Sequence, residues 1–236
     1  MFIRHHPERS GVRQHCEQSK DLHFRLFIAA VLLAMPALAQ PPDLLKRVDD
    51  HYNHLHTLRA RYTERYTGMG LDRTESGTLE LRKPGLMRWS YDAPVGKLFV
   101  LDGKFAWFYT PGDAQVTRAP AKQLDDLRTP LRLLLGHTQL AKELDHIAVA
   151  PVTSASQTQA TFTITGIPKA MADRVHWLTL TVSADGAIHS MKIDEITGAT
   201  TFFIFSDQKE DLPIPPSDFI FTPPAGLPVV NAQPPI

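Results

Sequence analysis

Three histidines form the one cluster in the sequence whose spacing suits a metal ion: His51, His54 and His56. On a helix, His51 and His54 would share a face, because residues three positions apart lie on the same side. No carboxylate is spaced to converge on them, as a metal site of this kind would require. We therefore favour solvated surface histidines over a metal site, and we predict no metal centre and no cofactor.

Acidic residues occur as adjacent pairs, which are Asp49–Asp50, Asp125–Asp126 and Asp194–Glu195. Neighbouring side chains diverge on a helix or a strand, so each pair is typical of a polar surface. The sequence contains no nucleophile elbow, Walker loop, dinucleotide fingerprint or His-Glu-x-x-His motif. We predict that the protein is not an enzyme and has no catalytic residues; a small exported hydrolase that uses rim aspartates is the alternative.

Large aromatic side chains gather in the middle of the chain: Trp89, Tyr91, Phe99, Phe105, Trp107 and Tyr109. We expect them on neighbouring strands. They could fill an ordinary barrel core, or they could line an unfilled interior that holds an apolar ligand. Composition alone leaves both possibilities open.

The N-terminal region has the pattern of a secretory signal peptide. Five basic residues precede an apolar run over residues 26–35, and Pro36 and an Ala-Leu-Ala sequence follow it. The run is shorter than the roughly 20 residues that span a bilayer. We predict cleavage after Ala39, so that residues 1–39 are a signal peptide and residues 40–236 a single exported domain; an uncleaved anchor is the alternative.

Charge and cysteine content exclude several function classes. The chain has 25 basic and 25 acidic residues, and the predicted mature part keeps 20 and 22 of them. A net charge of about −2 gives no basic field for nucleic acid. The only cysteine, Cys16, lies in the leader, so the mature protein has no disulfide, thiolate nucleophile or lipid-anchoring cysteine.

One amphipathic helix should open the mature domain. Leu44, Val48, Tyr52 and Leu55 recur at spacings of four, four and three, which predicts a helix ending near His56. Beyond it, alternating residues and turn signals predict strands at residues 59–66, 76–83, 86–91, 98–101, 105–109, 115–117, 160–165, 176–183, 187–193, 201–206 and 218–222.

Two short helices should interrupt the strands, at residues 130–135 and 139–144. Thr129-Pro130 is a helix start, Gly136 a stop, and Leu131, Leu134 and Leu135 share one face. A sheet of this size curls or closes, and the leucines need an apolar surface to cover. The fold class is therefore mainly β: an unclosed antiparallel barrel of about ten or eleven strands, with an N-terminal helix and central helices on its concave side.

Several motifs resemble the periplasmic outer-membrane lipoprotein carrier family, LolA, in order and spacing. They are residues 76–91 (SGTLELRKPGLMRWSY), 102–109 (DGKFAWFY), 115–116 (QV), 129–135 (TPLRLLL) and 219–226 (FIFTPPAG). Each motif is moderately specific, and their order and spacing fit the family over nearly the whole mature chain.

The resemblance implies an open barrel whose helices form a lid over an apolar cavity. It implies a periplasmic carrier that accepts acylated lipoproteins from an ABC-type inner-membrane release complex and delivers them to the outer membrane, where an acceptor lipoprotein receives them if one is present. A shuttle of this kind is expected to be a monomer. A binder or sensor of other lipids on the same barrel, and an interaction module with a filled barrel, are the alternatives.

The resemblance also assigns residues to the cavity and to the lid. Acyl chains would contact Leu79, Leu81, Met87, Trp89, Tyr91, Phe99, Phe105, Trp107 and Tyr109. The lid and its latch would comprise Lys83, Tyr52, Leu131, Leu134 and Leu135.

Two positions depart from the family pattern. Lys83 stands where the family usually has an arginine that holds the lid by its backbone carbonyls; lysine lacks the forked donor set, so the closed lid should be held less firmly. Arg82 should face away from the cavity and cannot replace it. Met87 replaces an aromatic residue that is frequent at the cavity mouth, and plain packing is the alternative role for it. For a residue at the mouth, we expect Met87→Glu to abolish acyl binding without unfolding the domain.

Overall fold

The computed structural model describes residues 43–123, 134, 139–152 and 160–231. These residues belong to one compact unit, Gln40–Ile236. The expected signal peptide lies outside the described residues, as do Leu131 and Leu135. Among the residues that the structure describes, no helix is long and apolar enough to cross a membrane.

The N-terminal helix α1, Leu44–His54, covers part of the concave side of a curved sheet. Its apolar stripe of Leu44, Val48 and Tyr52 is buried, as the sequence predicted. The Tyr52 hydroxyl accepts a hydrogen bond of 3.0 Å from the Ile188 amide and so fixes the helix to the sheet. A second helix, α4, spans Leu140–Glu143, and its first amide donates to the carboxylate of Asp49 on α1.

Twelve strands form one sheet, in the order β12-β6-β5-β4-β3-β2-β1-β11-β10-β9-β8-β7. Every neighbouring pair is antiparallel except β12 and β6, which are parallel. The strands are β1 (Thr57–Gly68), β2 (Leu71–Arg82), β3 (Leu86–Ala93), β4 (Leu98–Asp102), β5 (Phe105–Tyr109), β6 (Val116–Pro120), β7 (Leu144–Val152), β8 (Thr161–Pro168), β9 (Val175–Ser183), β10 (Ile188–Glu195), β11 (Thr200–Glu210) and β12 (Val229–Asn231).

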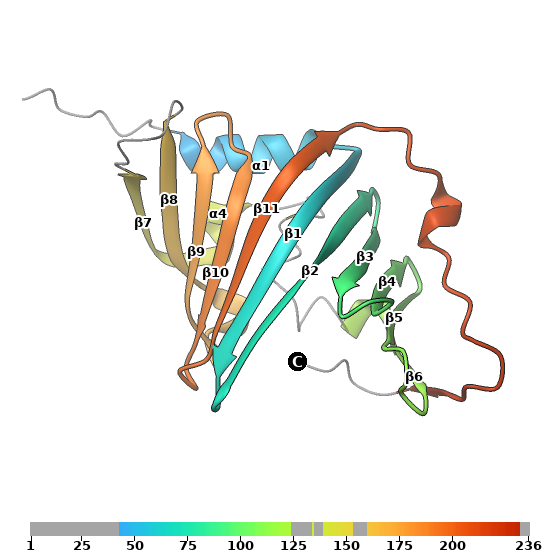
Figure 1. Cartoon of the computed structure of the whole chain (residues 1–236). Coiled ribbons are helices and arrows are strands. Elements are labelled where there is room, and N and C mark those ends of the chain that lie inside the picture. Colours follow the sequence, from blue (N-terminus) through green and yellow to red (C-terminus); the bar gives the residue numbers. More distant parts are fainter. Residues whose placement is uncertain (1–42, 124–133, 135–138, 153–159, 232–236) are drawn as a thin grey trace, which may run out of the picture. The chain divides into compact units, whose positions relative to one another are not determined.

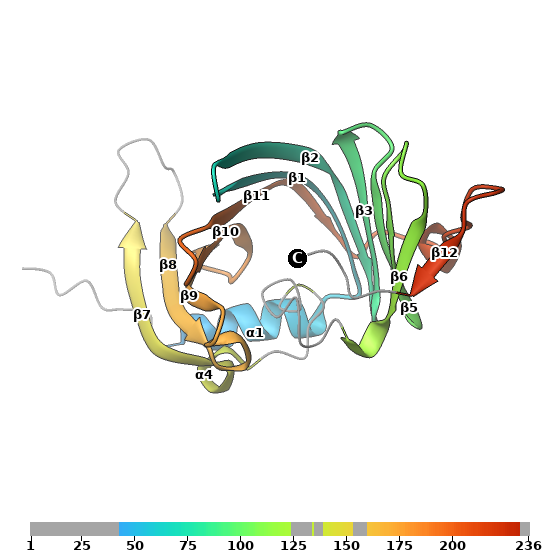
Figure 2. The ribbon, with the colours of Figure 1, turned by 90° about the horizontal axis from the view of Figure 1, so that it is seen from below.

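The sheet curls around α1 but does not close, so β7 and β12 remain as its two edges (Figures 1 and 2). The predicted mainly-β, unclosed barrel is confirmed. The sheet has twelve strands and not the expected ten or eleven, because β7 and β12 were not predicted. The predicted strand at 218–222 is not formed: Pro216–Phe219 make a short 3-10 helix, η3, and the last strand is β12.

Along each strand, alternate side chains point to the concave face, and these are the buried ones. On β2 the buried side chains are those of Glu75, Leu79 and Leu81, with Gly77 between them. A Cβ atom at Gly77 would lie 2.0 Å from the Ser90 carbonyl oxygen, so only glycine permits this approach of β2 and β3.

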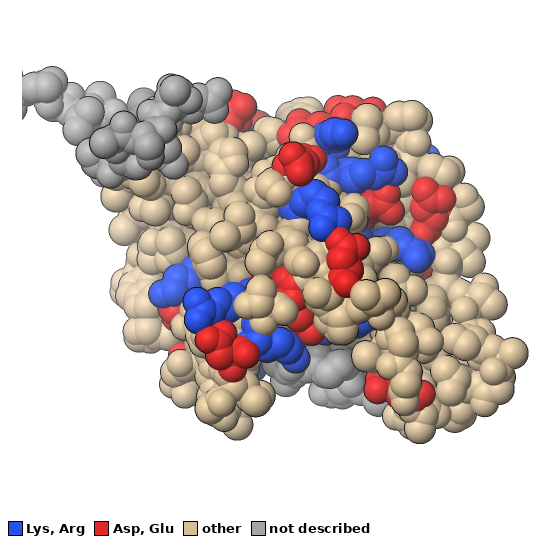
Figure 3. Space-filling model, viewed as in Figure 1, with Lys and Arg blue, Asp and Glu red and all other residues tan. Residues whose placement is uncertain are grey.

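The convex face carries charges of both signs (Figure 3). Many are paired across strands, as Arg59 is with Glu80 and Arg65 with Asp72, both at 2.7 Å. The C-terminal segment crosses this face: Arg82 donates to the Ile214 carbonyl at 2.7 Å. Arg82 therefore faces away from the concave side, as the alternation predicted.

Candidate functional site

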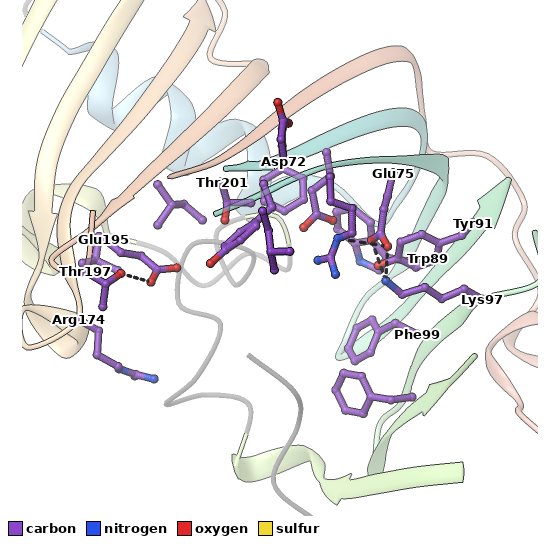
Figure 4. Close-up of a pocket in the computed structure, with 18 of the residues that line it drawn as sticks. Asp72, Glu75, Trp89, Tyr91, Lys97, Phe99, Arg174, Glu195, Thr197 and Thr201 are labelled. Atoms are coloured by element: carbon purple, nitrogen blue, oxygen red, sulfur yellow. Dashed lines mark hydrogen bonds and ion pairs between the residues drawn. The ribbon is translucent and has the colours of Figure 1, made fainter. Parts of the chain in front are cut away.

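A cavity of about 870 Å³ lies inside the curved sheet. Its apolar lining comes from the inner faces of several strands and includes Trp89, Phe99, Phe108, Val175, Ile193 and Phe203. Figure 4 shows Trp89, Tyr91, Phe99 and Lys97 on one side and Arg174, Glu195 and Thr197 across from them. The volume falls within the roughly 300–1,000 Å³ typical of small-molecule sites.

The interior is filled at one end of the sheet and hollow at the other. Leu79 and Leu81 on β2 pack in one cluster with Leu44, Val48 and Tyr52 of α1. Towards the β1–β2 turn, the same strand presents Glu75, Arg73 and Leu71, which border the cavity. Helix α1 thus supplies the side chains that fill one part of the barrel, and the residues beyond its reach enclose open space.

Four of the predicted cavity residues, Trp89, Tyr91, Phe99 and Tyr109, border the cavity. Trp89 packs edge-to-face on Tyr62 at a centroid distance of 4.4 Å, and Phe99 tilts against Phe108 at 5.0 Å. Trp89 and Phe99 are register partners, so Trp89, Phe99 and Phe108 form an apolar part of the wall across β3, β4 and β5.

Leu79, Leu81 and Met87 do not line the cavity; they are buried in the packed core against the helix. The Met87 sulfur accepts a hydrogen bond of 2.9 Å from the Trp89 indole N–H. Met87 therefore lies in the core and not at the cavity mouth. Met87→Glu would bury an unpaired carboxylate, and this should unfold the domain and not merely block binding.

Phe105 and Trp107 lie on the opposite face of the sheet from the cavity. With Val100 and Val116 they form an outer cluster, which Phe221 and Leu227 of the C-terminal segment cover. Side chains alternate along β5, so Phe108 faces the cavity where Phe105 and Trp107 were expected. Tyr109 borders the cavity, but its ring packs on Phe221 at 5.8 Å, in the outer cluster.

Two of the predicted lid residues, Tyr52 and Leu134, are part of the apolar cluster that fills one end of the barrel. Tyr52 and Leu134 are both about 1% exposed and belong to the core cluster of the sheet and α1. Burial raises the pKa of Tyr52 well above its ordinary value, although the hydrogen bond from Ile188 opposes this.

Lys83, the predicted latch, lies where β2 meets the end of α1. Its amide donates to the His56 carbonyl at 2.9 Å. The ammonium nitrogen is shielded from solvent and finds no hydrogen-bond acceptor among the described residues. Burial lowers the pKa of Lys83, and the nearby Asp211 carboxylate partly offsets that effect. Lys83 follows Glu75 by eight residues, so along a strand it lies roughly 26 Å from the charged part of the cavity wall.

Sequence reasoning missed the charged residues in the cavity wall. Glu75 is about 5% exposed and is paired with Lys97, whose ammonium lies 2.8 and 2.7 Å from the two carboxylate oxygens. Glu75 lies four and six residues before Leu79 and Leu81 on β2, so it shares their face of the strand. This spacing was the signal that Glu75 points inward.

The three histidines act separately. His51 contacts Glu210 at 2.9 Å, His54 Nδ1 lies 2.7 Å from the Asp50 carbonyl oxygen, and His56 lies 3.6 Å from Asp211. Within the described ranges, no group of three histidine, cysteine or acidic residues is placed to hold a metal ion.

Comparison with known proteins identifies the family. The model of the family described as outer membrane lipoprotein carrier protein LolA matches residues 53–222. An outer-membrane lipoprotein carrier protein of Nitrosomonas europaea is 28% identical over 214 residues, which are 89% of this chain and 98% of that protein. One of Nitrosospira multiformis is 30% identical over 160 residues, 67% of this chain and 73% of that protein.

The fold is also found among solved structures. The crystal structure of an uncharacterized conserved protein from Thermus thermophilus matches with a TM-score of 0.52 at 13% sequence identity, covering 80% of this chain and 97% of that one. Because the family model spans most of the curled sheet and the cavity within it, this chain belongs to the LolA family of outer membrane lipoprotein carrier proteins.

Proposed function

We propose that this protein is a periplasmic carrier that holds the acyl chains of lipoproteins in its cavity and shuttles them from the inner to the outer membrane. The observation that carries the proposal is the hollow of about 870 Å³ inside the sheet, whose lining combines aromatic and aliphatic side chains with charged ones. Family membership and the names of the relatives support the same role.

The energetics of the cargo explain why such a cavity is needed. Each buried methylene is worth about 0.8 kcal/mol, so a 16-carbon chain gains roughly 12 kcal/mol by leaving water. Free diffusion of an acylated protein between membranes is correspondingly slow. Aromatic walls offer many weak, undirected contacts, which cover the chains without a few strong bonds that would resist release.

Export precedes this function. We propose that cleavage after Ala39 releases the domain into the periplasm as a monomer. An ABC-type lipoprotein-releasing complex in the inner membrane would load it, and an acceptor lipoprotein in the outer membrane, where one exists, would unload it. The energy for loading would be spent by the release complex, so the carrier itself needs no nucleotide or cofactor.

The lid would be formed by α1 and the central leucines, with Lys83 as its latch. Tyr52 and Leu134 already pack against the inner face of the sheet. The shielded ammonium of Lys83 would bind carbonyl oxygens of the closed lid, and loading would break those contacts.

Native mass spectrometry of the mature protein, purified from periplasm without detergent, tests this function. The proposal predicts a bound acylated peptide or lipoprotein. A bound phospholipid would instead identify a carrier or sensor of other lipids. An empty protein that also takes up no acylated peptide from mixed micelles would contradict the proposal.

A further inference from the structure

Charged side chains interrupt the apolar wall of the cavity, and two of them, Glu75 and Lys97, form an ion pair. Glu75 on β2, Tyr91 on β3 and Lys97 just before β4 lie side by side on neighbouring parts of the sheet. Gly77, two residues after Glu75, is the register partner of Tyr91, and the Tyr91 amide donates to the Lys97 carbonyl at 3.1 Å. The backbone thus brings the carboxylate and the ammonium together on the concave face (Figure 4).

The contacts hold both groups in place. The Lys97 ammonium lies 2.8 and 2.7 Å from the two Glu75 oxygens and 4.4 Å above the Tyr91 ring. Arg73 approaches the same carboxylate at 3.5 Å. Two cations therefore flank the buried Glu75 carboxylate, and Glu64, its register partner on β1, also borders the cavity.

A structural role alone does not explain this pair. Taking both charges out of water is costly, and apolar residues of similar volume often stabilise a protein at least as well. The Lys97 side chain keeps about 24% of its surface exposed, and it borders the cavity beside Tyr91 and Phe99. An ammonium held in this position can donate to a ligand without leaving its carboxylate.

We infer that the Glu75–Lys97 pair anchors the carbonyl oxygen by which an acyl chain is joined to its head group. This inference rests on the proposed function, since it requires acyl chains in the cavity. Bound there, the carbonyl oxygen accepts a hydrogen bond from Lys97, and the chain extends over Phe99 and Trp89. The head group then lies towards Arg73 and the β1–β2 turn. An acyl ester or amide carbonyl is the shared chemistry, and both lipoproteins and phospholipids carry it.

Binding of two matched lipids tests the inference: dioleoylglycerol, which has two ester carbonyls, and the dialkyl ether of the same chain length, which has none. The wild-type protein should bind the ester about tenfold more tightly, as expected for one hydrogen bond from a charged donor. Lys97→Met should lose that preference and keep the affinity for the ether. Lys192→Met is the control, because Lys192 is ion-paired with Asp194 at 2.9 Å and precedes the cavity residue Ile193 on the same strand.

The outcomes distinguish a failure of the Glu75–Lys97 anchor from a failure of the proposed carrier function. Equal binding of ester and ether by the wild type, or an ester preference that survives in Lys97→Met, would overturn the inference and leave acyl binding intact. Binding of neither lipid would overturn both. If Lys97→Met does not fold, the double variant Glu75→Leu/Lys97→Met removes the pair without an unpaired charge and should show the same loss.

Competition identifies the natural source of the carbonyl. A triacylated cysteinyl peptide and phosphatidylethanolamine are each added against bound dioleoylglycerol. Displacement by either supports the inference, and displacement by neither overturns it.

Discussion

Side chains that face inward near the hollow end of the sheet decide how much of it stays empty. Ile193 on β10 and Val175 on β9 are short, and the space before them is the cavity. Larger residues at the same positions would fill the barrel as α1 fills the other end. The capacity that we propose for acyl chains would therefore depend on a few side chains in a fixed sheet.

Ile193→Trp should lower acyl binding severalfold, because the added ring occupies cavity volume that the chain would use. Titration with a fluorescent fatty-acyl probe measures the change. Ile204→Trp is the matched control: Ile204 is 47% exposed, so the same substitution there should leave binding unchanged. Equal binding by both variants and the wild type would show that chains do not enter the cavity.

A second residue-scale effect concerns the β4–β5 turn. Asp102 accepts hydrogen bonds from the Lys104 and Phe105 amides and the Trp107 indole at 2.8, 2.6 and 2.7 Å. Burial by itself would raise the pKa of Asp102, but these hydrogen bonds outweigh it and hold the pKa below its ordinary value.

The stabilisation by Asp102 should be present above about pH 4, the ordinary value for an aspartate, and be lost as the pH falls through the lower folded-state pKa. Asp102→Asn should therefore destabilise the protein at pH 7 and show a smaller further loss at pH 3. Urea unfolding at the two pH values measures this, with the exposed Asp113→Asn as control. An unchanged acid dependence in Asp102→Asn would refute the assignment.

Aromatic residues also show where sequence reasoning at this scale stops. The inward positions of Trp89 and Phe99 follow from strand alternation. Strand β5, however, is apolar on both faces, so its pattern does not say which face is inside. The outer face of β5 is covered by a segment that comes more than a hundred residues later in the chain. Nothing in the sequence near β5 indicates this cover, so the cavity was the expected place for Phe105 and Trp107.

At the scale of elements, most strands were predictable and two were not. Regular alternation and turn residues marked the long strands from β1 to β3 and from β8 to β11. Strand β7 is an edge strand with a register shift between Asp145 and Ala148 and a proline at 151, so its alternation is broken. Strand β12 has only three residues, and its pairing with β6 depends on tertiary packing.

The C-terminal segment should stabilise the sheet from outside. Phe219 in η3 is about 1% exposed and η3 contacts β3 and β4, whereas the next residue, Ile220, is 67% exposed. Phe219→Ala should cost about 3–5 kcal/mol of unfolding free energy, and Ile220→Ala less than about 0.5 kcal/mol. Urea unfolding curves compare the two; similar small losses would mean that the segment is not part of the folded core.

Lys83, the proposed latch directly after β2, should control the opening of the lid. Lys83→Leu should remove the donor to the lid and slow or block correct release of cargo, while Lys83→Arg should keep or strengthen closure. Transfer of a lipoprotein from the loaded carrier to outer-membrane vesicles measures release. Unchanged transfer by Lys83→Leu would remove Lys83 from the mechanism.

For the whole molecule, the central feature is a single sheet that packs one helix against part of its concave face and leaves the rest hollow. The small net charge of the predicted mature domain, about −2, and the mixed charges of the convex face suit the proposed carrier, which would diffuse between two membranes. The family resemblance gave the expectation of a cavity; which residues line it depended on where α1 stops filling the barrel, and that boundary is set by tertiary packing.

Photo-cross-linking of a triacylated cysteinyl peptide with a diazirine at the end of one chain tests this central claim most directly. After irradiation of the loaded protein, peptide mass spectrometry locates the modified residues. We predict labels on inward-facing residues of the cavity, among them Phe99, Phe108 and Phe203. Labels confined to the outer cluster of Trp107 and Phe221, with none inside the sheet, would contradict it.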